Sequence, residues 1–350
     1  MTAAWLILAS AAASRAAESS AHSRIPRVDL HTHLDSVATA DALMQVAAVL
    51  EERHQVRLAV VFNLQPFQPV GKPQPLTPES FAEMEKRYAG RILSCIGDYN
   101  VPAGLRYSPG ELATWKERGV VGYKIWYPVV IGRDPPAPDQ FTIHTPDYPG
   151  IDSPANAPVF AAMERLGMVG TGIHIGQALP RRWENPVHFW TAIHSWLRVM
   201  DRHPRLVVVM AHMMNLFYSD EQLDFLRYVL ETYPNLHVEI GGRFSDFHAM
   251  RRDHLRAFMI QYADRILYGT DFAPFALRDG TEAGATRYVS SFQLLESDAA
   301  VSMAVGKAPA KPARGLALPT DVLEKIYHLN AARLYPRVKE VLEAQGYRLD

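Results

Sequence analysis

Short apolar segments alternate with helical patterns along most of this chain. The expected strands cover residues 28–33, 57–63, 92–97, 120–126, 168–174, 206–212, 236–241 and 266–271. Strands that alternate with helices favour a parallel sheet with helical crossovers. Eight such units in a chain of 350 residues predict an α/β fold, the (β/α)8 or TIM barrel. We expect residues 25–350 to form this barrel as a single domain.

Two irregular segments and a closing pair of helices complete the predicted barrel. Residues 127–158 are rich in proline and aspartate and too long for an ordinary connection. Residues 272–319 form a second irregular region. We expect both to be long loops at the C-terminal face of the barrel, where they would shape specificity. Helical patterns over 321–334 and 337–345 predict extra C-terminal helices.

Side chains that commonly bind metals stand at the ends of five expected strands. These residues are His31, His33, Lys124, His174, His212 and Asp271. The active site of a (β/α)8 barrel lies at the C-terminal ends of its strands, and neutral imidazoles and carboxylates bind divalent metals. The set predicts a metal site there. Taken singly, a strand-end histidine such as His212 is more often structural, and Lys124 would more often anchor a substrate.

The spacing of these residues along the strands supports a common orientation. Because His31 and His33 are two positions apart, their imidazoles share one face of the first strand. A glycine also precedes several of the other residues by two positions. The pairs are Gly122 with Lys124, Gly172 with His174, and Gly269 with Asp271, and Gly170 stands a further two positions before Gly172. We expect the glycines to share the face of the polar residue and to leave space inside the barrel.

Charge and cysteine content exclude several classes of function. The formal net charge is -1, and no long run of like charges occurs. Nothing therefore argues for nucleic acid or an anionic membrane as a partner. We expect a small-molecule substrate, and a homodimer is compatible with the sequence. The single cysteine, Cys95, lies in an apolar run and cannot form an intrachain disulfide, so we expect a buried hydrophobe.

The N-terminus resembles a secretory signal. An apolar stretch covers residues 3–13 and small residues suited to cleavage follow as far as residue 17, although no basic residue precedes Arg15. We interpret residues 1–24 as a signal peptide or as a disordered N-terminus. The first alternative predicts a periplasmic or secreted protein, and the second a cytoplasmic one. No other segment is long and apolar enough to span a bilayer, so we expect no stable membrane association.

Several motifs occur in a fixed order along the chain. They are VDLHTHLD, GIHIG, VVVMAHMMN and RILYGTDFAP, followed by IYHLNAARLYP near the end. Together they resemble the amidohydrolase superfamily of metal-dependent hydrolases. More narrowly, they resemble the branch that includes aminocarboxymuconate-semialdehyde decarboxylase and other aromatic-acid decarboxylases. The resemblance spans about residues 28–336. An H-x-H alone is unspecific, whereas the ordered set is specific.

This resemblance implies a role for each matching residue. One divalent metal, most often zinc in this family, would be bound by His31, His33, His174 and Asp271. His212 would be a ligand to a second metal or a general acid/base, and Asp271 would take the proton of a metal-bound water. The chemistry supports this assignment, because such a site lowers the pKa of its water towards about 7. A neighbouring carboxylate can then transfer the proton.

Lys124 decides between one metal and two. The segment KIWYP beginning at Lys124 resembles the fourth-strand motif of dihydroorotase-like members, in which a carboxylated lysine bridges two metals. Burial would favour the neutral amine that reacts with CO2. We favour this binuclear site, because an unmodified ammonium would be repelled by a dication. In the alternative, Lys124 faces a substrate carboxylate.

Other residues are candidates for the substrate pocket. Arg243, just past the seventh expected strand, either binds a carboxylate by bidentate bonds or forms a surface ion pair. Trp126 and Tyr127 follow Lys124 and would line the pocket.

The sequence thus favours a metal-dependent hydrolase that cleaves an amide, ester or lactone bond in a small carboxylated substrate, by attack of metal-bound hydroxide. The alternative is a non-oxidative decarboxylase of an aromatic or unsaturated carboxylic acid. A carboxylated Lys124 and two metals would favour hydrolysis. A third alternative, a metal-binding scaffold without turnover, requires a missing element, and none is missing.

Overall fold

Eight parallel strands form the centre of the protein. The structure is a computed structural model, and it describes residues 22–64, 76–99, 104–126, 150–175, 186–303 and 311–349. Each strand pairs with the next along the chain. The strands are β1 (Arg27–Thr32), β2 (Leu58–Asn63), β3 (Ile92–Tyr99), β4 (Gly122–Trp126), β5 (Val169–Ile173), β6 (Val208–Met210), β7 (Leu236–Glu239) and β8 (Ile266–Leu267).

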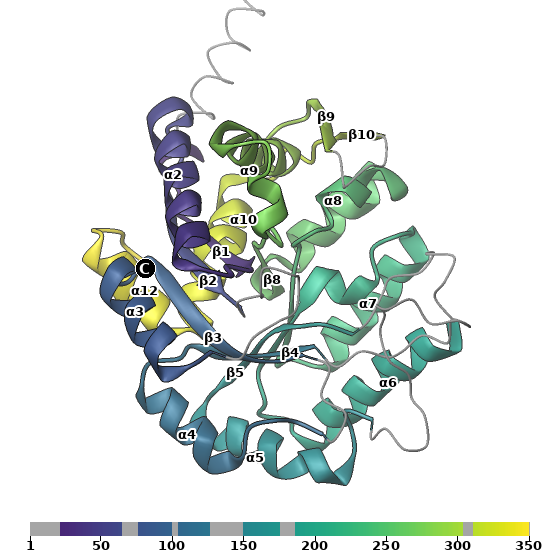
Figure 1. The fold of residues 1–350 in the computed structure, drawn as a ribbon. Coiled ribbons are helices and arrows are strands. Elements are labelled where there is room, and N and C mark those ends of the chain that lie inside the picture. Colours follow the sequence, from purple (N-terminus) through teal and green to yellow (C-terminus); the bar gives the residue numbers. More distant parts are fainter. Residues whose placement is uncertain are drawn as a thin grey trace, which may run out of the picture.

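The eighth strand returns to the first. The backbone N–H of Leu30 in β1 donates to the carbonyl of Tyr268, just past β8, at 3.1 Å. Thr32 forms a parallel bridge with Phe272. The sheet therefore comes close to a closed barrel, with helices around it (Figure 1). This confirms the predicted (β/α)8 fold.

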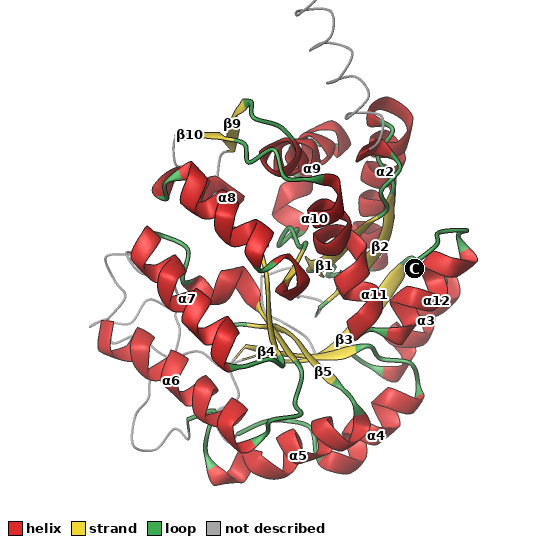
Figure 2. Cartoon of the chain, turned by 180° about the vertical axis from the view of Figure 1, so that it is seen from behind, coloured by secondary structure: helices red, strands yellow, loops and turns green. Residues whose placement is uncertain are grey.

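One helix follows each strand of the barrel. These helices are α2 (Val37–His54), α3 (Pro78–Tyr88), α4 (Pro109–Glu117), α5 (Ala157–Leu166), α6 (Pro186–Arg202), α7 (Asp220–Thr232), α8 (Arg252–Gln261) and α9 (Thr281–Glu296). Figure 2, seen from behind, shows them as a layer outside the strands. β2 is buried at every position, because strands with helices outside and core inside face no water.

The second irregular region was predicted wrongly in part. Residues 272–319 contain helix α9, a hairpin of β9 (Ala300–Met303) and β10 (Lys311–Arg314), and a short 3-10 turn. The helical pattern of α9 is weak because small residues face the core. A Cβ on Gly284 would lie 2.8 Å from Val46 of α2, so glycine permits the close approach of these helices.

The C-terminal helices close the end of the barrel where the strands begin. They are α10 (Thr320–Glu324), a π-helical turn (Lys325–Leu329), α11 (Asn330–Leu334) and α12 (Pro336–Ala344). Tyr335, between the last two, is buried in the inner core cluster, and its hydroxyl lies 2.9 Å from Thr171 Oγ1. Cys95 belongs to the same cluster, which confirms the prediction that its side chain is buried among apolar residues. The opposite end of the barrel, where the strands finish, carries the predicted ligands.

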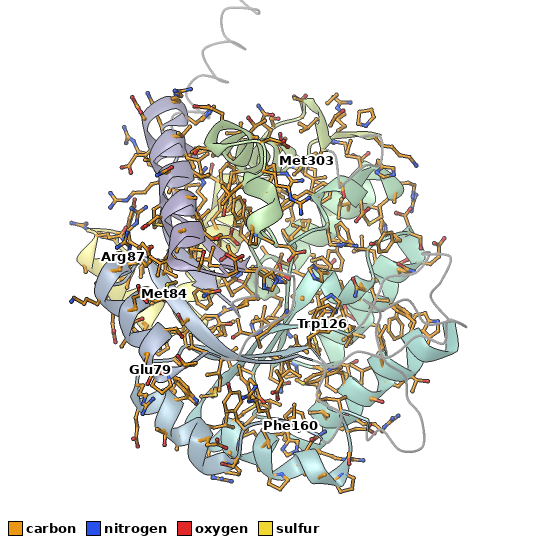
Figure 3. The ribbon with its side chains drawn as sticks, viewed as in Figure 1. Glu79, Met84, Arg87, Trp126, Phe160 and Met303 are labelled. Atoms are coloured by element: carbon orange, nitrogen blue, oxygen red, sulfur yellow. The ribbon has the colours of Figure 1, made fainter. Side chains whose placement is uncertain are left out.

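A second core cluster lies between the strands and the helices. In Figure 3, Phe160 of α5 lies in this helical layer, whereas Trp126 lies at the end of β4. The ring of Phe160 is 5.8 Å from that of Trp196 in α6. Barrel and helices are thus held by separate inner and outer cores.

Some expectations fall outside the described residues. They concern the signal-like residues 1–17, Tyr127 and most of the 127–158 segment. Of the latter, the structure describes residues 150–158, which include a 3-10 turn (Pro154–Asn156) and the start of α5. Among the helices that the structure describes, none has the length and apolar character needed to cross a membrane.

Candidate metal centre

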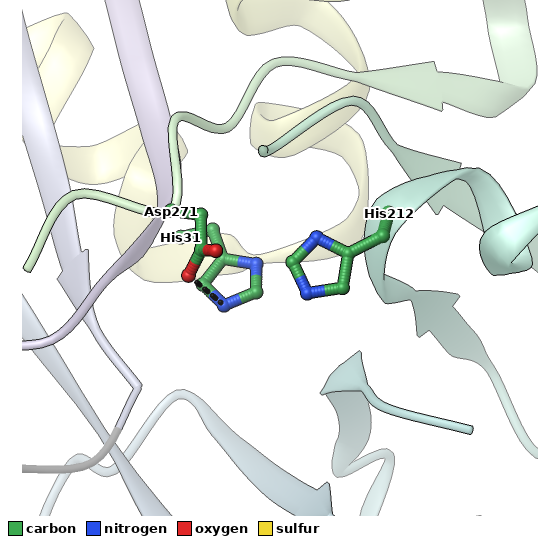
Figure 4. A group of neighbouring side chains, drawn as sticks. All are labelled: His31, His212 and Asp271. Atoms are coloured by element: carbon green, nitrogen blue, oxygen red, sulfur yellow. Dashed lines mark ion pairs between the residues drawn. The ribbon is translucent and has the colours of Figure 1, made fainter. Parts of the chain in front are cut away.

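Three ligand-type side chains meet at the end of the barrel where the strands finish (Figure 4). His31 comes from β1, His212 from the turn after β6, and Asp271 from the segment after β8. Their candidate ligand atoms all lie within 4.8 Å of one another. His31 Nε2 is 3.3 Å from Asp271 Oδ1. Imidazole nitrogens and a carboxylate oxygen at these separations could hold one divalent cation.

The other two predicted histidines lie at the same mouth. His33 Nε2 is 3.1 Å from His31 Nε2 and 3.3 Å from Asp271 Oδ1. The ring of His174 lies 4.8 Å, centroid to centroid, from that of His212. The structure therefore brings together all four predicted histidines and Asp271.

Lys124 lies just below these residues in the barrel. Its side chain is buried, and Nζ donates a hydrogen bond to the carbonyl of Gly172 at 2.5 Å. Burial lowers the pKa of Lys124 to about 8, although the charges of Asp271 and Glu239 oppose this shift. The amine is therefore more easily deprotonated than that of an exposed lysine.

Glu239 is a residue of the site that the sequence analysis missed. It ends β7, is fully buried, and its Oε1 lies 2.8 Å from His31 Nδ1. The same oxygen accepts the backbone N–H of His212 at 2.9 Å. The only signal in the sequence was a lone carboxylate in the apolar segment LHVEIGG. Buried carboxylates are rare unless they are paired, so a glutamate in an apolar strand indicates a partner inside the protein.

Hydrogen bonds set which nitrogen of each imidazole can face a metal. His212 Nδ1 lies 2.6 Å from the carbonyl of Gly241. A carbonyl only accepts, so Nδ1 carries the proton and Nε2 keeps its lone pair. For His31, Nδ1 faces the Glu239 carboxylate, which leaves Nε2 towards Asp271. Both arrangements are typical of metal-bound histidines.

Burial keeps His31, His174 and His212 neutral, and neighbouring imidazoles keep Asp271 ionised. Burial lowers the pKa of His212 to about 4 and holds the pKa values of His31 and His174 well below the ordinary histidine value. Burial would raise the pKa of Asp271, but its contacts with His31 and His33 outweigh this and hold that pKa well below its usual range. Neutral imidazoles and a carboxylate are the forms that bind metals.

The backbone around two of these residues is left-handed. His212 to Asn215 all have φ between 54° and 58°, and Asp271 has φ 59°. The sequence predicts strands through His212 and Asp271, but β6 ends at Met210 and β8 at Leu267. Left-handed geometry costs roughly 1–2 kcal/mol per residue outside glycine. The four-residue turn is wholly buried, so its surroundings hold it in place.

Gly170, one of the two glycines before His174, does not face the side that strand alternation predicts. Gly170 faces Val208 and Ile173 of the outer core, whereas Gly172 faces Leu64 and Lys124 inside the barrel. Gly172 has φ +62°, and the pairing of β5 with β6 shifts register between Thr171 and Ile173. The predicted common face was therefore wrong for Gly170, whereas Gly172 faces the interior and His174 reaches the mouth.

Asp29 is a second carboxylate that the sequence analysis missed. Its Oδ1 accepts the backbone N–H groups of His31 and Thr270, each at 3.0 Å. Its Oδ2 accepts the hydroxyl of Tyr288 from α9 at 2.6 Å. Asp29 thereby ties β1 to the segment that carries Asp271. Burial raises the pKa of Asp29 to about 6.

The predicted substrate residues are placed in part. Arg243 lies just past β7, is mostly buried, forms an ion pair with Asp246 at 3.3 Å and lies 5.4 Å from the ring centre of Tyr218. Trp126 is half-buried, and its ring is 4.9 Å from that of His174. Tyr127 lies outside the described residues. Trp126 thus borders the site, and Arg243 forms an ion pair that is mostly buried rather than at the surface.

The side chains present fit a divalent metal. They offer lone pairs on nitrogen and oxygen that converge on one place, and the histidines are oriented by acceptors behind them. This set suits zinc and other first-row metals better than calcium, which prefers oxygen ligands alone. The arrangement can hold a Lewis acid beside a carboxylate that can take up a proton.

Two solved structures resemble the chain, and the first of them supports the fold. An uncharacterised TIM-barrel protein from Bordetella bronchiseptica is 14% identical, with a TM-score of 0.50 over 90% of this chain and 99% of that one. A 2,6-dihydroxybenzoate decarboxylase from Rhizobium is 19% identical, with a TM-score of 0.47 over 89% and 98%. No curated protein matches the chain.

The sequence also matches a family model. The model, described as amidohydrolase, matches residues 28–337. This range begins at β1 and ends in α12, so it contains every strand of the barrel and all the candidate ligands. The chain therefore belongs to the amidohydrolase family.

Proposed function

We propose that the protein is a metal-dependent hydrolase that cleaves an amide, ester or lactone bond in a small carboxylated substrate. The observation that carries the proposal is the convergence of His31, His212 and Asp271 within 4.8 Å at the mouth of the barrel. Membership of the amidohydrolase family supports it. We propose zinc as the metal because of the mixture of imidazole and carboxylate ligands.

Each side chain has a separate role in this proposal. His31, His33, His174 and Asp271 would hold the metal, which when bound supplies a Lewis acid for the substrate carbonyl and for water. Asp271 would take up a proton on its carboxylate and pass it to the leaving group. Nε2 of His212 would bind a second cation or act as a general acid/base. Arg243 would bind the substrate carboxylate in place of Asp246, and Trp126 and Tyr127 would line the pocket.

Decarboxylation is the second candidate. It requires an unmodified Lys124, whose Nζ would keep its hydrogen bond to the carbonyl of Gly172. An unmodified lysine leaves one metal, which would bind the substrate carboxylate. His212 would then support proton transfer to carbon.

Metal content tests the proposed function directly. We expect the purified protein to contain at least one divalent metal per chain by elemental analysis, and stringent chelation to abolish turnover. Lactones and N-acyl amino acids should be screened beside aromatic acids, with release of CO2 followed in parallel. Full turnover after chelation would contradict the proposal, and CO2 release without hydrolysis would favour the second candidate.

The Lys124→Ala variant separates a bridged pair of metals from a single one. If Lys124 is carboxylated, the wild type should bind two metals and the variant should lose at least one. The wild type should also take up label from 13C-bicarbonate, giving a carbamate carbon signal by NMR that the variant lacks. Lys116→Ala is the matched control, because Lys116 also donates to a backbone carbonyl but lies in α4, away from the site. One metal per chain in all three proteins would exclude the bridge.

A further inference from the structure

The side chain of Glu239 fits inside the barrel because two residues beside its carboxylate are glycines. A Cβ on Gly241 or on Gly269 would lie 2.5 Å from Glu239 Oε2. The Cβ on Gly269 would also lie 3.0 Å from the Cβ of His31. Real carbon atoms do not approach so closely, so any larger residue would displace the carboxylate. The surroundings are therefore shaped to fit a carboxylate at this position.

The carboxylate of Glu239 faces hydrogen-bond donors from three separate segments. Oε1 faces His31 Nδ1 and accepts the backbone N–H of His212, while Oε2 accepts the backbone N–H of Gly241 at 2.5 Å. His31 belongs to β1 and His212 to the turn after β6. One side chain thus links two of the three residues that converge at the mouth.

We propose that Glu239 is a positioning residue that fixes both His31 and His212 for metal binding. By accepting a hydrogen bond from His31 Nδ1–H, it selects the tautomer whose Nε2 lone pair faces Asp271. By accepting the N–H of His212, it holds the left-handed turn that presents the second imidazole. The inference rests on the proposed function, because it assumes that the site binds a metal.

The Glu239→Gln variant tests this role with little change in shape. Three donors face the two oxygens of the carboxylate, and glutamine supplies only one oxygen. Its amide NH2 must therefore meet a donor, and one of the contacts is lost. We expect the affinity for Zn2+, measured by competition with a chromogenic chelator, to fall about 10- to 100-fold. The visible spectrum of the Co2+-loaded protein should also change, because the ligand geometry around the ion is altered.

Asp98→Asn is the matched control. Asp98 is also a buried strand-end carboxylate, and it accepts the backbone N–H of Arg106 at 2.7 Å and the hydroxyl of Tyr123. It contacts none of the candidate ligands. We expect this variant to keep the Zn2+ affinity and Co2+ spectrum of the wild type, even if its thermal stability falls. A general effect of removing a buried charge would instead lower metal affinity in both variants.

Two further measurements keep the inference testable if the glutamine variant does not fold. Glu239→Asp keeps the charge but shortens the reach, and we expect weaker Zn2+ binding from it as well. In the chelated wild type, 15N NMR should show His31 protonated at Nδ1. Wild-type Zn2+ affinity in either variant, or an Nε2-protonated His31, would overturn the inference. A wild type that binds no metal would instead contradict the proposed function.

Discussion

Replacing Asp271 with asparagine is expected to lower kcat/KM by about 10²- to 10⁴-fold, the usual contribution of an acid/base group. Asparagine has the same shape as aspartate and tolerates the left-handed backbone found at this position (φ 59°). Its amide oxygen can still accept a hydrogen bond from His33. The charge is lost, however, and an amide cannot take up the proton that hydrolysis requires. Steady-state kinetics on the substrate identified by screening would measure the effect.

The control for Asp271→Asn lies a few residues further along the chain. Asp279→Asn makes the same chemical change at an exposed position before α9, and we expect activity like that of the wild type. Metal content and thermal unfolding of Asp271→Asn should be recorded as well, since the residue is also a candidate ligand. A variant that folds and turns over substrate at the wild-type rate would remove Asp271 from the chemistry.

The mouth of the barrel could be predicted because its ligands stand at strand ends in the sequence. His31 lies on β1 and His33 directly follows it, and Asp271 follows the apolar strand that ends the barrel. Each could be recognised locally from an apolar run followed by a metal-ligating side chain. The topology then brings them together, since all strands of such a barrel end on the same side.

The contacts between distant segments could not be predicted in this way. Glu239 touches His31 across 208 positions of sequence, and nothing near Glu239 indicates that partner. The turn at His212 contains no glycine, so local sterics favour an extended chain. Tertiary contacts impose the left-handed conformation instead, including the bond from His212 to Glu239. Left-handed backbone often occurs at functional sites for this reason.

The buried ion pair below the mouth has the largest expected effect on stability. Arg27, at the start of β1, is fully buried, and its guanidinium lies 2.7 Å from Glu296 of α9. It also lies 4.7 Å from the ring centre of Tyr327, whose hydroxyl donates to the same carboxylate at 2.8 Å. The strand that carries His31 and leads to His33 is therefore held at its first residue, Arg27, by one carboxylate.

Glu296→Gln should lower the free energy of unfolding by about 3–5 kcal/mol, because it leaves the buried guanidinium without a counter-charge. The matched control is Glu282→Gln, which removes the partner of Arg53 at the other end of α9. There both side chains are about 60% exposed (60% and 59%), and water screens the pair, so we expect a loss below about 1 kcal/mol. Urea unfolding of both variants, with metal chelated, measures the difference. Equal losses would mean that the buried pair is replaced by water or by the aromatic rings around Arg27.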